Sequence, residues 1–244
     1  MRYLVLSDIH ANIEALEAVL ATERDFAQVL VLGDLVGYGA DPNAVVDRVR
    51  DLPVAAIVRG NHDKVAAGLA SVESFNPIAR QAIAWTAKAL SPLSLEWLAA
   101  LPEGPVSVTD AIEVCHGAPF DEDFYVFDEM DAQRAAPSVT RTLCLFGHTH
   151  VPGVFRLGAG VTGERKPRHE PWVHTMTPPE RALVNCGAVG QPRDGDPRAA
   201  YGVLDTDAGT VTLARVTYDV RGAQAKILAA GLPTALANRL AVGR

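Results

Sequence analysis

Short apolar runs alternate with amphipathic segments along the N-terminal part of the chain. Five runs rich in valine, isoleucine and leucine have the length of buried strands: Tyr3–Leu6, Val29–Leu32, Val54–Val58, Ile112–Cys115 and Leu143–Phe146. Between the first three runs, the spacing of apolar residues predicts one helix after an N-cap at Asn12 and a second over Ala44–Val49. This alternation of strands and helices predicts a parallel sheet with right-handed crossovers.

The second half of the chain has a different character. Two helices are predicted over Pro77–Leu90 and Leu93–Leu101, and a set of short strands follows: Val154–Leu157, Ala182–Val184, Tyr201–Asp205 and Val211–Thr217. Ala223–Leu240 is predicted to be helical, with an interruption at Gly231-Leu232-Pro233. These elements indicate an α/β sandwich of two mixed sheets, in one domain over residues 1–244 with a C-terminal helical segment (about 221–244) packed on it.

Two stretches are predicted to lie on the surface. Gly158–Pro179 is rich in glycine, proline and charge, which predicts a surface excursion, and its His169 and His174 are expected to face solvent. The acidic stretch Asp121–Asp131 is predicted to be a solvated loop whose charge would disfavour long polyanions.

Composition and charge limit the partners and the cellular compartment that we expect for the protein. The 244 residues include 29 acidic and 22 basic side chains, so the formal net charge is −7, which argues against a nucleic-acid polymer as partner. No run of 18 apolar residues is present and the N-terminus leads directly into a strand, so we expect no membrane span and no signal peptide. The three cysteines are widely spaced and odd in number, which favours a reducing, cytoplasmic location over a disulfide framework or a cysteine-built zinc site.

Five short motifs hold nearly all the residues that can bind a metal, and each follows a predicted strand. They are Asp8-Ile9-His10, Gly33-Asp34, Gly60-Asn61-His62-Asp63, His116-Gly117 and Gly147-His148-Thr149-His150. Taken singly, an aspartate after a strand often only caps a helix, and an isolated histidine is often only packed or solvated. Taken together at the carboxyl ends of strands, the motifs favour a metal site. Their two aspartates, one asparagine and four histidines exceed a single coordination shell, so two ions are predicted rather than one.

These motifs, in this order, resemble the calcineurin-like metallophosphoesterase superfamily, and are most similar to its small bacterial and archaeal phosphodiesterase-like branch. The phosphoprotein phosphatase branch is a poorer match, because this chain continues Leu35-Val36-Gly37 after Asp34 and ends its third motif in Asp63. The resemblance implies a four-layer α/β/β/α sandwich. It also implies one ion held by Asp8, His10, Asp34 and His150, and a second held by Asp34, Asn61, His116 and His148, with Asp34 bridging.

The implied activity is hydrolysis of a phosphate ester by in-line attack of a hydroxide that bridges the two ions. The resemblance makes His62 the general acid that protonates the leaving oxygen, and an imidazole suits that role because its pKa lies near neutrality. Asp63 either orients His62 or only caps the following helix. Asn12 and Arg193 are candidate contacts to the substrate, against the alternatives of an N-cap for Asn12 and a surface salt bridge for Arg193.

The sequence therefore predicts a dinuclear, metal-dependent phosphodiesterase acting on small phosphodiesters or nucleotides. Three alternatives stay open: a phosphomonoesterase, a dinucleoside-polyphosphate hydrolase, and a non-catalytic protein-binding scaffold of the same fold. Nitrogen and oxygen ligands without thiolate accommodate manganese, iron, nickel, cobalt or zinc, of which manganese is favoured. The expected partner is a small phosphate-ester substrate, and the apolar Ala223–Leu240 helices either cover the core or form a homo-oligomer interface.

Overall fold

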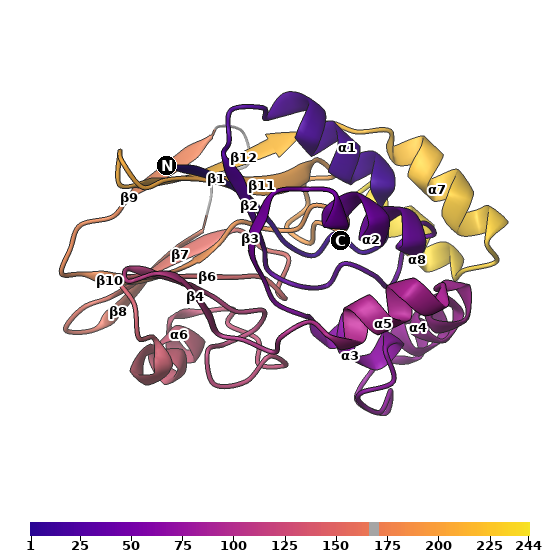
Figure 1. Ribbon diagram of the computed structural model, residues 1–244, viewed down its shortest axis with the longest axis horizontal. Helices are drawn as coiled ribbons and strands as arrows, with labels where there is room; N and C mark the ends of the chain where they lie inside the picture. Colours follow the sequence, from indigo (N-terminus) through magenta and orange to yellow (C-terminus); the bar gives the residue numbers. More distant parts are fainter. Residues whose placement is uncertain (166–170) are drawn as a thin grey trace.

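Two six-stranded mixed sheets pack face to face in the computed structural model, and helices cover both outer faces (Figure 1). The structure describes residues 1–165 and 171–244. The first sheet has the order β3 (Val54–Ile57), β2 (Gln28–Val31), β1 (Arg2–Leu6), β11 (Ala199–Asp205), β12 (Thr210–Val216) and β9 (Trp172–Thr175). The second has the order β4 (Val106–Thr109), β5 (Ile112–Val114), β6 (Leu143–Phe146), β10 (Arg181–Asn185), β7 (Gly153–Leu157) and β8 (Val161–Arg165). This arrangement confirms the predicted α/β sandwich.

The period-two alternation of the strands builds the layers. In β1, Leu4 and Leu6 face the helices outside the first sheet, whereas Tyr3 and Val5 face the second sheet. In β6, Leu143 and Leu145 point into the same inter-sheet core, and Cys144 and Phe146 point outward under a helix. Since both faces of these strands are buried, their sequences read as continuous apolar runs rather than as alternating ones.

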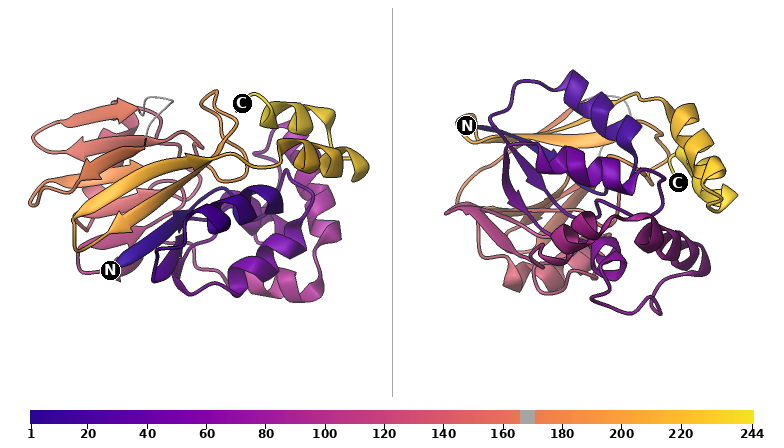
Figure 2. Two further views of the ribbon diagram at one scale, coloured as in Figure 1. Left: turned by 90° about the horizontal axis from the view of Figure 1, so that it is seen from above. Right: turned by 45° about the vertical axis from the view of Figure 1, so that its right-hand side comes forward.

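Helices of two groups cover the sheets (Figures 1 and 2). Apolar side chains from one group pack on the outer face of the first sheet: α1 (Ile13–Thr22), α2 (Pro42–Arg50), α4 (Pro77–Ala89), α5 (Pro92–Ala99), α7 (Val220–Ala229) and α8 (Thr234–Leu240). The second sheet is covered by α6 (Glu129–Ala135), which continues into the 3₁₀ helix η1 (Ala136–Ser138). The short helix α3 (Asn61–Ala66) follows β3 directly.

The C-terminal helices are part of the core cover. Ala223 and Ile227 of α7 and Leu236 and Leu240 of α8 are buried in the same apolar cluster as Leu4 of β1. Of the two roles considered for Ala223–Leu240, covering the core is therefore the one that the packing shows. None of the described helices combines the length and the apolar character needed to cross a lipid bilayer.

The prediction of a surface excursion over Gly158–Pro179 is only partly right, because most of its described residues are exposed or half-buried but the stretch is not irregular. Strands β8 and β9 both lie in this stretch, and they add an edge strand to each of the two sheets. His174 does not face solvent but is 2% exposed on β9, opposite Val211 of β12, because alternate residues of a strand face the sheet's covered side. His169 lies outside the described residues.

The topology brings the carboxyl ends of two parallel sets of strands to one edge of the sandwich. In the first sheet β1, β2 and β3 run parallel, and in the second sheet β5, β6 and β10 do. The segments that leave these six strands carry every motif singled out in the sequence. The fold thus places those side chains at a common mouth, where ligands of open α/β sheets bind.

Candidate metal centre

Seven polar side chains from five strand ends converge in the interior of this edge. Each is at most 9% exposed, although buried aspartate and histidine are costly without partners. They are Asp8 and His10 after β1, Asp34 after β2, Asn61 after β3, His116 after β5, and His148 and His150 after β6.

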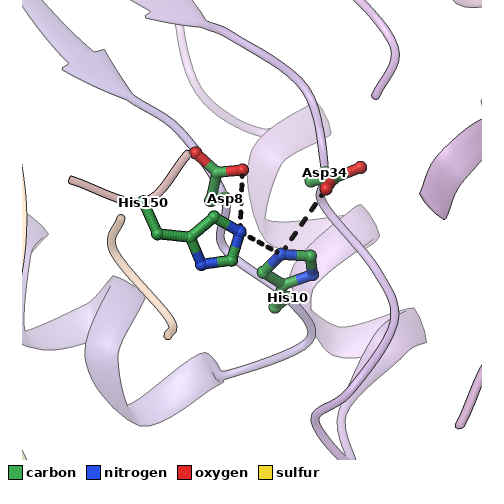
Figure 3. Close-up of side chains that lie close together, drawn as sticks. All are labelled: Asp8, His10, Asp34 and His150. Atoms are coloured by element: carbon green, nitrogen blue, oxygen red, sulfur yellow. Dashed lines mark hydrogen bonds and ion pairs between the residues drawn. The ribbon is translucent and has the colours of Figure 1, made fainter. Parts of the chain in front are cut away.

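Four of these residues form a first cluster (Figure 3). One ligand atom from each of Asp8, His10, Asp34 and His150 lies within 4.8 Å of the others. The Nε2 atoms of His10 and His150 are 3.1 Å apart, and His150 Nε2 is 3.3 Å from an oxygen of Asp8. The Oδ2 atom of Asp34 is 3.5 Å from His10 Nε2.

A second cluster shares Asp34 with the first. It contains Asp34, His116 and His148, and the amide oxygen of Asn61 reaches it. The Nε2 atom of His116 is 3.4 Å from Asp34 Oδ2, 3.1 Å from His148 Nδ1 and 3.3 Å from Asn61 Oδ1. Asp34 Oδ2 therefore lies between the two clusters, facing an imidazole nitrogen of each.

Backbone carbonyls fix which ring nitrogen each histidine offers. The Nδ1 atoms of His10, His116 and His150 lie 3.0, 2.7 and 2.6 Å from the carbonyl oxygens of Val36, Leu32 and Gln191, so Nδ1 is the donor in each ring. In His148 the Nε2 atom faces the carbonyl of Asp123 at 3.2 Å, which leaves Nδ1 for the cluster. A hydrogen bond of this kind orients a metal-binding histidine and turns its unprotonated nitrogen to the ion.

This arrangement fits divalent cations. In the first cluster, two unprotonated Nε2 atoms face each other at 3.1 Å, and neither carries a hydrogen to place between them. Their lone pairs repel unless a cation lies between them, and imidazole with carboxylate is a donor set that divalent transition metals favour. In the second cluster His148 Nδ1, Asp34 Oδ2 and the neutral amide oxygen of Asn61 lie around His116 Nε2, which gives a donor set of the same kind.

The electrostatics of the site also favour added positive charge. Burial lowers the pKa of His10, His148 and His150 well below the usual value, so these rings are neutral donors. Burial acts in the same sense on His116, but the Asp34 carboxylate outweighs it and raises the pKa of His116 to about 10. Burial, with Asp34 nearby, raises the pKa of Asp8 to about 7. The buried carboxylates thus draw a cation into the site, either a proton or a metal ion.

The backbone at the site is strained. Among the described non-glycine residues, seven have positive φ, and five of the seven are candidate ligands: Asp8, His10, Asp34, His148 and His150, at 49° to 66°. A left-handed conformation costs an L-residue about 1–2 kcal/mol and persists only where the surroundings enforce it. Sharp turns of this kind let two side chains separated by one residue leave a strand end toward the same point.

Comparison with known proteins identifies the family to which this fold belongs. The model of the calcineurin-like phosphoesterase superfamily domain matches residues 1–209. The chain belongs to the calcineurin-like phosphoesterase superfamily. An uncharacterized protein of Methanocaldococcus jannaschii is 35% identical over 245 residues, which cover 98% of this chain and 97% of that protein. The predicted family resemblance is thereby confirmed.

Solved structures of similar proteins agree with this family assignment. A metallophosphoesterase from Sphaerobacter thermophilus is 39% identical, with a TM-score of 0.88 over 100% of this chain and 99% of that one. A hypothetical protein from Pyrococcus horikoshii is 18% identical, with a TM-score of 0.77 over 100% and 98% of the two chains, and shares the fold. The phosphoesterase domain therefore carries its candidate metal centre on the fold predicted for it.

His62 lies beside the candidate metal centre without being part of either cluster. Its ring is 4% exposed and touches three other rings, with centroids at 4.9 Å from His10, 4.4 Å from Tyr38 and 4.7 Å from Phe75. Its Nδ1 atom is buried and has no hydrogen-bond partner among the described residues, so Nε2 is the nitrogen through which the ring can act. Burial lowers the pKa of His62 to about 4.

Two secondary candidates are hydrogen-bonded to the protein's own backbone. The carboxylate of Asp63 accepts from the N–H groups of Val36 and Gly60, at 3.1 and 3.0 Å, and not from His62. These hydrogen bonds are the ones expected of the capping alternative, and the orienting role of Asp63 stays a prediction. The Asn12 side-chain oxygen accepts from Ala15 N–H at 3.1 Å, as an N-cap does, and its amide nitrogen donates to the Gly190 carbonyl at 2.9 Å. The N-cap alternative is thus observed, and a contact of Asn12 with substrate stays a prediction.

A cavity of about 180 Å³ opens onto the centre. Its wall includes His62, His148 and Asn61 together with three aromatic residues that the sequence did not single out, Tyr38, Phe75 and Tyr125. Tyr125 stacks on the His148 ring at 3.8 Å between centroids. Tyr125 belongs to the acidic stretch Asp121–Asp131, which was predicted to be a solvated loop. That prediction is only partly right, because Glu122 is 6% exposed and forms ion pairs with Arg59 and Lys64. The sequence signal that could have identified Tyr125 is its position shortly after the His116-Gly117 motif.

The candidate metal centre leaves no room for a side chain at Gly60. A Cβ atom there would overlap the Asp34 carboxylate, although the backbone of Gly60 has a φ of −104° that any residue adopts. We expect Gly60→Ala to weaken metal binding about 10-fold or more, because the added methyl group displaces the Asp34 carboxylate. Disturbing the orientation of a metal ligand typically lowers metal affinity by that factor. Metal titration followed by elemental analysis measures this. Gly160→Ala, where a Cβ meets nothing within 4 Å, is the control, and equal affinity of both variants would contradict the expectation.

Proposed function

We propose that this member of the superfamily is a dinuclear metal-dependent phosphoesterase that hydrolyses small phosphodiesters or nucleotides. The position of Asp34 Oδ2 carries the proposal, because it faces His10 Nε2 at 3.5 Å in one cluster and His116 Nε2 at 3.4 Å in the other. A carboxylate in that position can hold two cations near each other. The proposed holders of one ion are Asp8, His10, Asp34 and His150, and those of the other are Asp34, Asn61, His116 and His148.

Two divalent ions, when bound, supply Lewis acidity and positive charge for phosphoryl transfer. Their proposed identity is manganese, with iron, nickel, cobalt and zinc as alternatives, because the donors are imidazole, carboxylate and amide oxygen without thiolate. Asn61 contributes no charge, so the centre keeps a net attraction for an anionic phosphate.

The chain's own side chains bind the ester and exclude water. The cavity beside the clusters has room for a small ester group, and the rings of Tyr38, Phe75 and Tyr125 narrow it. A small, partly aromatic cavity favours a small substrate over a long polymer, in keeping with the net charge of −7.

His62 is proposed to hold the proton that the leaving oxygen receives, at Nε2. Burial keeps the pKa of this ring low at about 4, and a bound phosphate beside it acts in the opposite direction by favouring the charged form. A scaffold that only binds other proteins has no use for such a ring at the rim of a metal centre. This is the observation that favours an enzyme over a scaffold.

Turnover of two matched esters tests the proposal. With manganese, kcat/KM for bis-p-nitrophenyl phosphate is expected to exceed that for p-nitrophenyl phosphate. A preference for the monoester favours the phosphomonoesterase alternative. Absence of turnover of both esters with manganese, iron, nickel, cobalt and zinc contradicts the enzyme and favours the scaffold.

We further propose that the protein works in the cytoplasm as one functional domain. Its three cysteines are buried and are not joined in disulfides, as expected in a reducing compartment. The helices α7 and α8 share the apolar cluster of the first sheet, which supports treating residues 1–244 as a single unit.

A further inference from the structure

Two arginines meet at the rim of the metal centre. Arg193 follows β10, and Arg239 lies in the last turn of α8. The side-chain oxygen of Gln191 accepts a hydrogen bond from each guanidinium, at 3.1 Å from Arg193 and 3.2 Å from Arg239. One neutral oxygen is thus shared by two positive charges.

Within the described ranges, neither guanidinium has a carboxylate within ion-pair distance, whereas neighbouring arginines do. Arg198 pairs with Asp196 at 2.6 Å, and Arg215 pairs with Asp194. The Nε atom of Arg193 is buried without a hydrogen-bond partner. Burial and the charge of Arg193 together lower the pKa of Arg239. Two adjacent uncompensated cations repel each other, and an anion placed between them removes that repulsion.

The pair lies next to the candidate centre. The main-chain oxygen of Gln191 contacts His150 Nδ1 at 2.6 Å, so the residue that joins the arginines also holds a metal-cluster histidine. The Arg193 guanidinium is 5.6 Å from the centroid of the Tyr38 ring, and that ring is 4.4 Å from the ring of His62. An anion bound by the arginines would therefore belong to the molecule whose ester lies at the cavity.

We propose that Arg193 and Arg239 form a site for a second phosphate group of the substrate, so that the preferred esters carry two phosphates. This inference rests on the proposed function. Guanidinium groups match phosphate oxygens with paired hydrogen bonds, which is why arginine is the usual residue at such sites. Arg239 lies outside residues 1–209, which the superfamily model matches, so this preference comes from the chain's C-terminal helices.

Kinetics on matched esters test the preference. The substrates are the p-nitrophenyl ester of thymidine 5′-phosphate and the same ester carrying a 3′-phosphate. With manganese, the wild type is expected to favour the second ester about tenfold in kcat/KM, mainly through KM, as two charged hydrogen bonds would give. Arg239→Met should bring the ratio near one, and Arg239→Lys should restore part of it. The control is Arg221→Met, at an exposed arginine of α7, which should keep the wild-type ratio.

Binding gives a second readout that does not need turnover. Isothermal titration calorimetry is expected to show thymidine 3′,5′-bisphosphate binding about tenfold more tightly than thymidine 5′-monophosphate, and Arg239→Met should remove the difference. A wild type without this difference, or an Arg239→Met variant that keeps it, overturns the inference.

The two readouts separate this inference from the proposed function. Hydrolysis of both esters without preference, and without a binding difference, leaves the phosphoesterase standing and refutes the arginine site. Absence of hydrolysis together with an Arg239-dependent binding difference refutes the phosphoesterase and supports the anion site. Circular dichroism of each variant checks that the protein is folded.

Discussion

Replacing Asp34 with asparagine is expected to lower metal content from about two ions per chain to at most about one, and kcat/KM by about 10³-fold. Asparagine keeps the shape of the side chain. Its oxygen can still accept a hydrogen bond from the backbone N–H of His62, whose nitrogen lies 2.9 Å from Asp34 Oδ1. It lacks the charge that faces His10 and His116 in the two clusters. Without that charge two cations repel each other more strongly than the remaining ligands compensate.

Elemental analysis after manganese loading measures the metal content, and bis-p-nitrophenyl phosphate measures the turnover. Asp110→Asn is the matched control, because it makes the same change at an exposed aspartate outside the centre. It should keep wild-type metal content and activity. An Asp34→Asn protein that is folded by circular dichroism and still holds two ions per chain would rule out Asp34 as the bridging ligand.

Replacing His62 with glutamine is expected to leave the metals in place and to reduce kcat by about 10²–10⁴-fold on esters with poor leaving groups. The ring is not part of either ligand cluster, so metal content should not change. Glutamine is polar and of similar size, but it cannot deliver a proton. The loss should therefore grow as the leaving alcohol becomes more basic, and p-nitrophenol esters should suffer least.

A series of phenyl phosphate esters with leaving groups of increasing pKa measures this dependence. His174→Gln serves as control, because it removes a buried imidazole on β9, outside the motifs that form the centre. It should leave the leaving-group dependence of the wild type unchanged. Equal turnover of His62→Gln and wild type across the series would remove His62 from the mechanism.

Much of this centre could be read from the sequence, because its ligands sit in short motifs directly after apolar strands. Asp8, His10, Asp34, His148 and His150 all leave a strand end within four residues, and parallel strands bring such ends together. The turns after these strands place the five residues in the left-handed region of backbone conformation. Nothing in the sequence predicts this conformation. Asp63 shows the limit of motif reading, because two backbone donors occupy its carboxylate.

Contacts between residues far apart in the chain could not be predicted from the sequence. Gln191 and Arg239 are 48 positions apart, and only the docking of α8 brings their side chains to 3.2 Å. Glycine, proline and charge in Gly158–Pro179 predicted irregular structure there, yet β8 and β9 form because the edges of both sheets offer hydrogen-bond partners. Local composition is overridden when a neighbouring strand is available for pairing.

The sequence by itself determined the strand–helix alternation, the two-sheet class and the ligand motifs. These follow from periodicity and from groups that lie a few residues apart in the chain. Only the tertiary structure decided that Asp34 Oδ2 lies between two histidine clusters and that aromatic rings enclose His62. It alone decided that Arg193 and Arg239 share one amide oxygen. The physical reason is that each depends on distances between groups far apart in sequence, which are fixed by how the two sheets and their covering helices pack.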